Sequence, residues 1–396
     1  MTKVKLNSIL IVLTIMFVNL WNVVEYYLNS NLVSIKVCFF VLFLLISVTI
    51  NHFQISYKSY LVLLISVIFF GINIMLVDYR NLVFDEFFKY VFFGISAMII
   101  ASYEFDAKFV SRYWFRISIF FFILMHLLLG AVSQREFNYM HFGFITNFVF
   151  VGFMFQYYKR RKVIYLIALL YIMILSFMFG HRGAVLVNLV IFVYFCYKIK
   201  LLKPMYIIFI SSIGAILYLF TSFRDNVLLN VLYRLQTKLP DSINSYVLKK
   251  LIFSLESENL DLSGREEHYS YGVEIIREKL YFFPSGFGYF DHVTNLGFPH
   301  NIFIDIYIVF GVFGALFLLY LFIKMRKILL RLNDLESLVI FSLFLYSFVR
   351  LMTGGTFIME PSFWVIVGIV INESFKRSYY KSNTDELKVL SNKSAL

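Results

Sequence analysis

The chain has little charge: Asp, Glu, Lys and Arg make up 15% of its 396 residues, whereas soluble proteins carry about 25%. It also has only five prolines and two cysteines. Such a low charge excludes an ordinary soluble globular protein. Cys38 and Cys196 stand in separate apolar runs without metal-ligand neighbours, so we expect no disulfide or metal at either and small apolar packing instead. There is no Asp-x-Asp motif and no His or Cys cluster at ligand spacing, and we therefore expect no metal and no cofactor.

Apolar residues, by contrast, are abundant and occur in long runs. Hydrophobic residues make up 60% of the chain, in runs of roughly 17 to 25, the length that crosses about 30 Å of hydrocarbon. We therefore predict an all-α integral membrane protein with about 12 transmembrane helices, the first of them a retained span and not a removable signal peptide. The expected spans are 7–28, 31–50, 59–77, 82–102, 114–132, 141–157, 163–179, 183–197, 205–222, 300–323, 336–352 and 361–375.

The basic residues that give the net charge of +12 are distributed in a regular way relative to these spans. Basic clusters fall between alternate pairs of spans, and the short loops between the other pairs carry mostly single arginines. Because loops rich in Lys and Arg stay in the cytoplasm, both termini are expected to be cytoplasmic in a multi-pass protein. The charge is thus a topology signal and gives no reason to expect nucleic acid. The clusters include Lys3 and Lys5, Lys108 and Arg112, 159–162, 324–327, and Lys376 and Arg377.

One long loop interrupts the pattern of spans. We divide the chain into nine spans over 1–222, a large extracytoplasmic loop over 223–299, three spans over 300–375, and a cytoplasmic tail over 376–396. The loop holds ten acidic and eight basic residues, and it has too many apolar residues at helical spacing to be disordered.

The second half of this loop predicts a helix. Ser263 and Glu266 have the spacing of a capping box, and Pro284 stands where a helix would stop. An apolar face is expected to follow at steps of three and four. Arg265 would lie in the first turn, where free N–H groups and the helix dipole favour a phosphate or diphosphate; it could equally pair with a neighbouring glutamate. The expected face is Tyr269, Gly272, Val273, Ile276 and Leu280.

Three further places in the sequence are expected at the same membrane face. His181 and Arg182 form the turn between two spans, although Arg182 could simply anchor the helix at the interface. Gly286 and Gly288 allow a tight turn or close approach of backbone to a ligand. Arg350, at the outer end of its span, is a further candidate, because ionisable groups in membranes tend to mark function.

The span that begins near residue 300 opens with a polar pair. His300 and Asn301 follow a proline and lie where the helix would leave the membrane. Asp305 is one turn further in, and Asn301 is a possible partner four residues away. Gly311 and Ala315 have the spacing of close helix packing. A lone histidine is often only a hydrogen-bonded one, but Arg182, Arg265 and His300 are all expected at the same face.

Three stretches carry a resemblance to a known family. "SGREEHYSYGVEIIREKLYFFPSGFG", followed by "PHNIFIDIYIVFGVFGALFLLYL", resembles the O-antigen polymerase and ligase superfamily of bacterial membrane proteins, and "GHRGAVLVNLVIF" is similar to its Arg-Gly-Ala turn before a span. The resemblance covers roughly residues 165–325. His181 departs from the family, which more often has a small polar residue there.

The resemblance implies a GT-C-like fold and a metal-independent membrane glycosyltransferase in the bacterial cytoplasmic (inner) membrane. The donor would be a glycan on undecaprenyl diphosphate. Arg182 and Arg265 match the arginines that bind the diphosphate, and His300 matches the catalytic histidine. Substrate contacts are expected from Asn301, Gly286, Gly288, Arg350 and His181.

These implications favour polymerisation of lipid-linked repeat units into O-antigen or capsular polysaccharide. A membrane lipid carrier and a chain-length regulator protein are the partners to expect. The alternatives are an O-antigen ligase, which transfers the polymer to lipid A core, and a transporter of lipid-linked glycan. A transporter would tend to show internal repeats and Gly- or Pro-interrupted helices near mid-membrane, and we find no repeat in the sequence.

Overall fold

In the computed structural model, every regular element among the described residues is helical. The structure describes residues 2–30, 32–134, 136–179, 182–198, 229–238, 252, 265–278 and 283–373. The expected span at 205–222, Ser263 of the capping box and the tail over 376–396 lie outside these residues. The chain divides into two compact units, unit 1 with residues 1–113 and 267–396, and unit 2 with residues 114–266.

Within the described part of the chain, five helices are long and apolar enough to cross a membrane: Lys3–Leu28, Val33–Ile50, Tyr57–Leu76, Ala107–Ser133 and Asp334–Met352. Shorter apolar helices cover Val163–Phe179, Gly183–Lys198 and Pro361–Asn372. The chain is therefore an all-α membrane protein, as its composition predicts.

Unit 1 contains most of the helices. They are α1 (Lys3–Leu28), α2 (Val33–Ile50), α3 (Tyr57–Leu76), α4 (Arg80–Lys89), the π-helix η1 (Tyr90–Ile95), α5 (Ser96–Ser102), α14 (Tyr289–Thr294), α15 (Ile302–Phe310), α16 (Val312–Arg331), α17 (Asp334–Thr353) and α18 (Pro361–Asn372). On α4, Lys89 forms an ion pair with Asp85 four residues earlier. We expected Cys38 to pack as a small apolar residue, but it is exposed on α2.

The core of unit 1 forms around α18. This helix is apolar on all sides and nearly every one of its residues is buried, which is typical of a helix surrounded by other helices. Gly368 lets it approach α5: a Cβ there would stand 2.3 Å from the carbonyl oxygen of Met98. Because α18 has 12 residues, it is shorter than the span expected at 361–375.

The predicted span at 300–323 is two helices and not one. Gly311 separates α15 from α16 with φ 60° and ψ −145°, a conformation open mainly to glycine. Gly314, in the first turn of α16, would carry a Cβ 2.5 Å from the carbonyl oxygen of Ile306. Gly311, expected to help pack this span against a neighbour, instead allows the chain to break, and Gly314 lets the two halves pack closely together.

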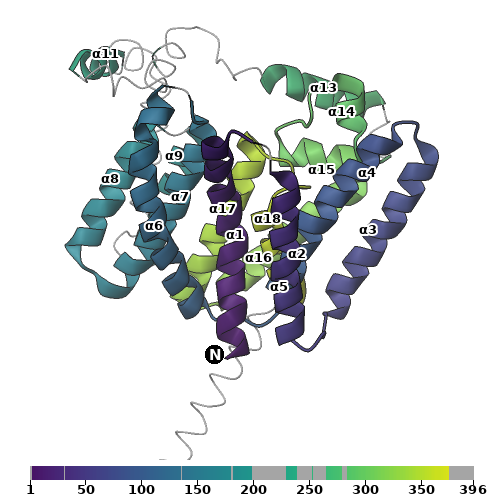
Figure 1. Cartoon of the computed structure of the whole chain (residues 1–396), viewed down its shortest axis with the longest axis horizontal. Helices are drawn as coiled ribbons and strands as arrows, with labels where there is room; N and C mark the ends of the chain where they lie inside the picture. The colour runs from purple at the N-terminus through teal and green to yellow at the C-terminus, as the bar shows by residue number, and fades with distance from the viewer. Residues whose placement is uncertain are drawn as a thin grey trace, which may run out of the picture. The chain divides into compact units, whose positions relative to one another are not determined.

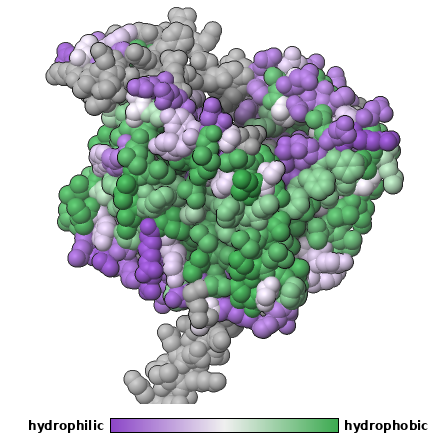
Figure 2. Space-filling view, in the orientation of Figure 1, coloured by the Kyte–Doolittle hydropathy of each residue, from purple (hydrophilic) through white to green (hydrophobic). Residues whose placement is uncertain are grey.

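Polar groups lie at both ends of unit 1. At one end, Asn7 donates to the carbonyl of Glu104, and Lys58 donates to the carbonyl of Ile371. At the other end α14 lies beside both α4 and α15, with α13 (Arg265–Glu278) nearby (Figure 1). Hydrophobic residues cover the visible faces of α2 and α3, and hydrophilic residues gather over α13 and α14 (Figure 2).

Unit 2 is a smaller helical group. It contains most of α6 (Ala107–Ser133), with α7 (Tyr139–Arg160), α8 (Val163–Phe179), α9 (Arg182–Lys198) and α11 (Leu229–Lys238). Helix α7 is largely buried. Trp114 Nε1 of α6 donates to the carbonyl of Phe148 on α7 at 2.9 Å, and a Cβ at Gly152 would meet Ser118 Oγ at 2.0 Å. A glycine and a buried hydrogen bond thus fix how α6 and α7 pack.

Candidate functional site

His300 occupies a constrained position at the start of α15. Its φ is +53°, a left-handed conformation that is uncommon for residues other than glycine and tends to occur where structure or function requires it. Asn301 begins the helix: its Oδ1 accepts from the N–H groups of Phe303 and Ile304 at 3.0 and 3.4 Å. This cap satisfies two of the helix's first N–H groups. It fixes the backbone next to His300 and gives Asn301, predicted to bind substrate, a structural function.

A second histidine, His268 of α13, lies beside His300. The two ring centroids are 4.8 Å apart. His268 Nδ1 lies 2.9 Å from the carbonyl oxygen of Phe298, and because a carbonyl only accepts, Nδ1 carries the hydrogen. The other nitrogen of a neutral His268 ring is then an acceptor. The Phe298 ring is also 4.4 Å from that of His300, so His268 and Phe298 flank His300.

Close packing holds α13 against α15. A Cβ at Gly272 would lie 2.5 Å from Ile304 Cγ2, so any larger residue there would require α13 or the Ile304 side chain to move. Beside this contact, Ile275, Phe290 and Ile308 form a buried apolar cluster. The apolar face of α13 therefore contains Gly272 as predicted, but Ile275 is buried where Val273, at 40% exposure, is not. The two histidines thus stand on helices with a shared core.

The loop over 285–288 is hydrogen-bonded to the C-terminal end of α15. The Ser285 and Gly286 N–H groups donate to the carbonyls of Ile308 and Val309 at 2.8 and 3.2 Å. Those carbonyls lie in the last turn of α15, where no intrahelical donor is available. A loop from elsewhere in the chain therefore satisfies the end of a helix that stops inside the protein.

The glycines of this loop have structural reasons to be glycine. Gly286 and Gly288 have φ of +89° and +74°, and a Cβ on Gly286 would meet Asn73 Nδ2 at 2.1 Å. Asn73 Oδ1 accepts from the Phe287 N–H at 3.0 Å, and Glu86 Oε2 accepts from the Gly288 N–H at 2.5 Å. The close approach predicted at these glycines is made to α3 and α4, and their substrate contacts stay a prediction.

Aromatic residues connect this loop to the start of α4. The Tyr79 and His292 rings stack with centroids 4.3 Å apart, and Tyr79 Oη donates to the carbonyl of Ser285 at 3.4 Å. Burial, together with the nearby Tyr289 and Glu86, raises the pKa of Tyr79 to about 12. The hydroxyl therefore remains a donor at neutral pH.

Asp305 faces the segment between α17 and α18. Its Oδ2 accepts from Thr356 Oγ1 at 2.7 Å and from the Phe357 N–H at 3.3 Å. The partner suggested by spacing, Asn301, caps the helix instead. Asp305 therefore links α15 to the 356–357 segment and is buried there.

Arg350 is buried in a polar network of unit 1. Its Nε donates to Glu360 Oε2 at 2.7 Å, and its Nη1 donates to Asn19 and Tyr346 at 2.9 and 3.0 Å. These contacts commit the guanidinium to α1, α17 and the residue before α18. They favour a structural function for Arg350 over the substrate contact expected from the sequence.

The other predicted site residues are not brought together by the described contacts. Arg182 is the first residue of α9 and Arg265 the first of α13; both side chains, and His181 entirely, lie outside the described residues. Their approach to His300 stays a prediction. His268 is the residue that the sequence analysis missed. Its only signal was its place on the predicted helix, three residues beyond Arg265.

No family model, curated protein or solved structure matches this chain.

Proposed function

We propose that the protein polymerises oligosaccharide repeat units carried on undecaprenyl diphosphate, forming O-antigen or capsular polysaccharide at the outer face of the bacterial cytoplasmic membrane. The observation that carries the proposal is the His268–His300 pair, with ring centroids 4.8 Å apart at the end of unit 1 where hydrophilic residues gather. A transferase acting on a lipid-linked glycan needs a rigidly held base at the face of the membrane.

The proposed reaction moves one glycan onto another. An acceptor hydroxyl oxygen bonds to the anomeric carbon of the donor while the bond from that carbon to the diphosphate oxygen breaks. His300 takes the proton from the hydroxyl, since an imidazole titrates near neutral pH. Undecaprenyl diphosphate leaves with the electron pair, and Arg182 and Arg265 stabilise its charge.

The proposed membrane topology is the one that the charge pattern favours, with about 12 spans in a GT-C-like arrangement and both termini in the cytoplasm. Lys3 and Lys5 then lie on the cytoplasmic side, and His268 and His300 on the outer side. Support comes from unit 1, in which α1 begins at the end away from α13 and α14 (Figure 1). A chain-length regulator protein is the partner expected at the outer side.

The test is the surface polysaccharide profile, on a gel, of a strain deleted for this gene. We expect core carrying a single repeat unit, a full ladder with the wild-type gene, and no ladder with His300→Ala or Arg265→Ala. His292→Ala, a histidine of α14 stacked on Tyr79, is the matched control and should restore the ladder. Immunoblotting of membranes shows whether each variant accumulates.

Other profiles contradict the proposal. Loss of all core-attached repeats while lipid-linked polymer accumulates makes the protein a ligase. A full ladder from both His300→Ala and Arg265→Ala removes the catalytic assignment. Glycan movement across reconstituted vesicles without glycosyl transfer makes it a transporter.

A further inference from the structure

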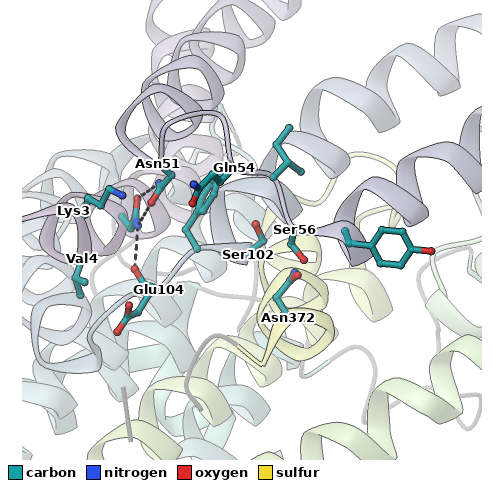
Figure 3. A pocket seen from close by; sticks show the side chains of 12 residues that line it. Lys3, Val4, Asn51, Gln54, Ser56, Ser102, Glu104 and Asn372 are labelled. Atoms are coloured by element: carbon teal, nitrogen blue, oxygen red, sulfur yellow. Dashed lines mark hydrogen bonds between the residues drawn. The ribbon is translucent and has the colours of Figure 1, made fainter. Parts of the chain in front are cut away.

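Unit 1 contains a polar cavity of about 400 Å³ at the end away from His300. The connections from α2 to α3 and from α5 to α6 line the cavity, together with the beginning of α1 and the end of α18. Asn51 and Gln54 lie on one side of it, with Glu104 and Asn372 across from them (Figure 3). The lining residues used below are Lys3, Asn51, Tyr57, Tyr103, Glu104 and Asn372.

The cavity wall is held in place by specific contacts. Asn7 and Asn51 exchange amide hydrogen bonds at 2.9 and 3.3 Å, and Asn7 also donates to the Glu104 carbonyl at 3.0 Å. The α2–α3 connection passes through two consecutive left-handed residues, His52 and Phe53, with φ of +54° and +59°. Such conformations persist only where the surroundings impose them. The site is therefore built into the fold and is not a loose gap between loops.

Two polar atoms of the lining have no hydrogen-bond partner among the described residues. Tyr103 is 7% exposed, yet its Oη makes no hydrogen bond among the described residues, and the same holds for Asn372 Oδ1. Burial raises the pKa of Tyr103 to about 12, so the hydroxyl is a donor at neutral pH. A buried polar group without a hydrogen-bond partner destabilises the folded state. A ligand that accepts from Tyr103 and donates to Asn372 removes both penalties.

The charges of the lining are balanced and opposite. Lys3 and Glu104 are its two charged residues, and neither has an ion-pair partner within the described part of the chain. One positive and one negative group match a zwitterion better than an anion or a cation alone. An ammonium with N–H groups would satisfy both Glu104 and the Asn372 amide oxygen, whereas a phosphate would accept from Lys3 and Tyr103.

The rim of the cavity continues into an apolar surface. Tyr57, which lines it, is the first residue of α3 and is 75% exposed. Further along the same helix, Leu64, Ile65 and Ile68 are 43%, 57% and 54% exposed. A membrane-crossing helix with so little buried surface contacts lipid tails. A headgroup in the cavity would therefore lie beside a surface for its acyl chains.

We propose that this cavity binds the headgroup of a lipid in which a phosphate is joined to a primary ammonium, with the acyl chains along α3. The phosphate accepts from Tyr103 and faces Lys3, and the ammonium donates to Glu104 and Asn372. The proposal is independent of the glycosyl transfer proposed above.

The test measures lipid binding by the purified full chain in detergent micelles, using native mass spectrometry and the shift in unfolding temperature. The probes are phosphatidylethanolamine, phosphatidylcholine, phosphatidylglycerol and the soluble glycerophosphoethanolamine. We expect phosphatidylethanolamine to bind and stabilise most. Phosphatidylcholine lacks ammonium N–H groups, and phosphatidylglycerol lacks the ammonium. Equal binding of the three lipids, or equal binding of the soluble headgroup, overturns the proposal.

Variants locate the binding. Tyr103→Phe should weaken phosphatidylethanolamine binding about tenfold, the effect of one hydrogen bond to a charged group. Glu104→Gln should reduce the preference over phosphatidylcholine. Tyr27→Phe, an exposed tyrosine in the last turn of α1 and outside the lining, is the matched control and should bind as wild type does. Unchanged binding by both cavity variants overturns the site. If Tyr103→Phe does not fold, Glu104→Gln still tests the site.

Discussion

The guanidinium of Arg350 forms a buried ion pair with the carboxylate of Glu360, with 2.7 Å between Nε and Oε2. The two side chains are 7% and 6% exposed. Glu360 also caps the N-terminus of α18, since its Oε1 accepts from the Ser362 N–H at 3.3 Å. Asn19 of α1 accepts from the same guanidinium. One buried pair thus connects α1 and α17 to the start of the helix at the centre of unit 1.

Removal of Arg350 alone should destabilise the protein strongly. In Arg350→Met the Glu360 carboxylate stays buried without its cation, which costs about 3–5 kcal/mol. The double variant Arg350→Met with Glu360→Gln should recover most of this loss, because a neutral amide can still accept from Ser362. Unfolding of the purified protein in detergent measures both. A stable Arg350→Met protein with no ladder on the polysaccharide gel would instead support the substrate-binding function predicted from the sequence.

Gly286→Ala should destabilise unit 1 more than Gly297→Ala. Both glycines have positive φ, +89° and +76°, so both variants bear a conformational penalty of about 1–2 kcal/mol. Only Gly286 also faces a contact: a Cβ there would meet Asn73 Nδ2 at 2.1 Å, while nothing lies within 4 Å of Gly297. Overpacking adds about 1–3 kcal/mol. Equal unfolding temperatures for the two variants would contradict the close approach of the loop to α3.

Much of the fold could be predicted from the sequence, because the length of an apolar run decides whether a helix can cross the membrane. The break at Gly311 could not. A single glycine in an apolar run is tolerated in many helices, and here the break depends on the Ser285 and Gly286 N–H groups, which satisfy the final carbonyls of α15. That partnership joins residues more than twenty positions apart and leaves no local pattern.

The site was predictable only in its outline. The His-Asn sequence at 300–301 marked the start of a helix, and Asn301 does cap it. The hydrogen-bond partners of the buried polar side chains were harder to predict. Arg350 and Asp305 find partners at Glu360 and Thr356, both in one segment that has no periodicity. His268 acquires its importance from a contact with His300, and contacts between separate helices are not encoded in spacing.

Gly272→Ala should separate α13 from α15 and reduce polymer length or yield. The added methyl would lie 2.5 Å from Ile304 Cγ2, and relief requires α13 or the Ile304 side chain to move, at about 1–3 kcal/mol. Ile304→Ala in the same gene removes the contacting atom and should restore part of the ladder. Gly71→Ala is the control, since nothing lies within 4 Å of Gly71 in α3; it should be neutral or slightly stabilising. A wild-type ladder from Gly272→Ala would show that the α13–α15 contact is dispensable.

His268→Phe should lower polymer formation without abolishing it, because His268 positions His300 and is not itself the proposed base. Phenylalanine keeps a ring near His300 but cannot donate to the Phe298 carbonyl, which leaves the segment before His300 less well held. Loss of one such hydrogen bond corresponds to about 1 kcal/mol, or roughly fivefold in rate. Asparagine can donate to the same carbonyl, so His268→Asn should retain more activity than His268→Phe. Initial rates of repeat-unit transfer in membranes measure the difference. Complete loss in both variants, with normal protein levels, would make His268 a proton-transfer group in its own right, and wild-type rates in both would remove it from the site.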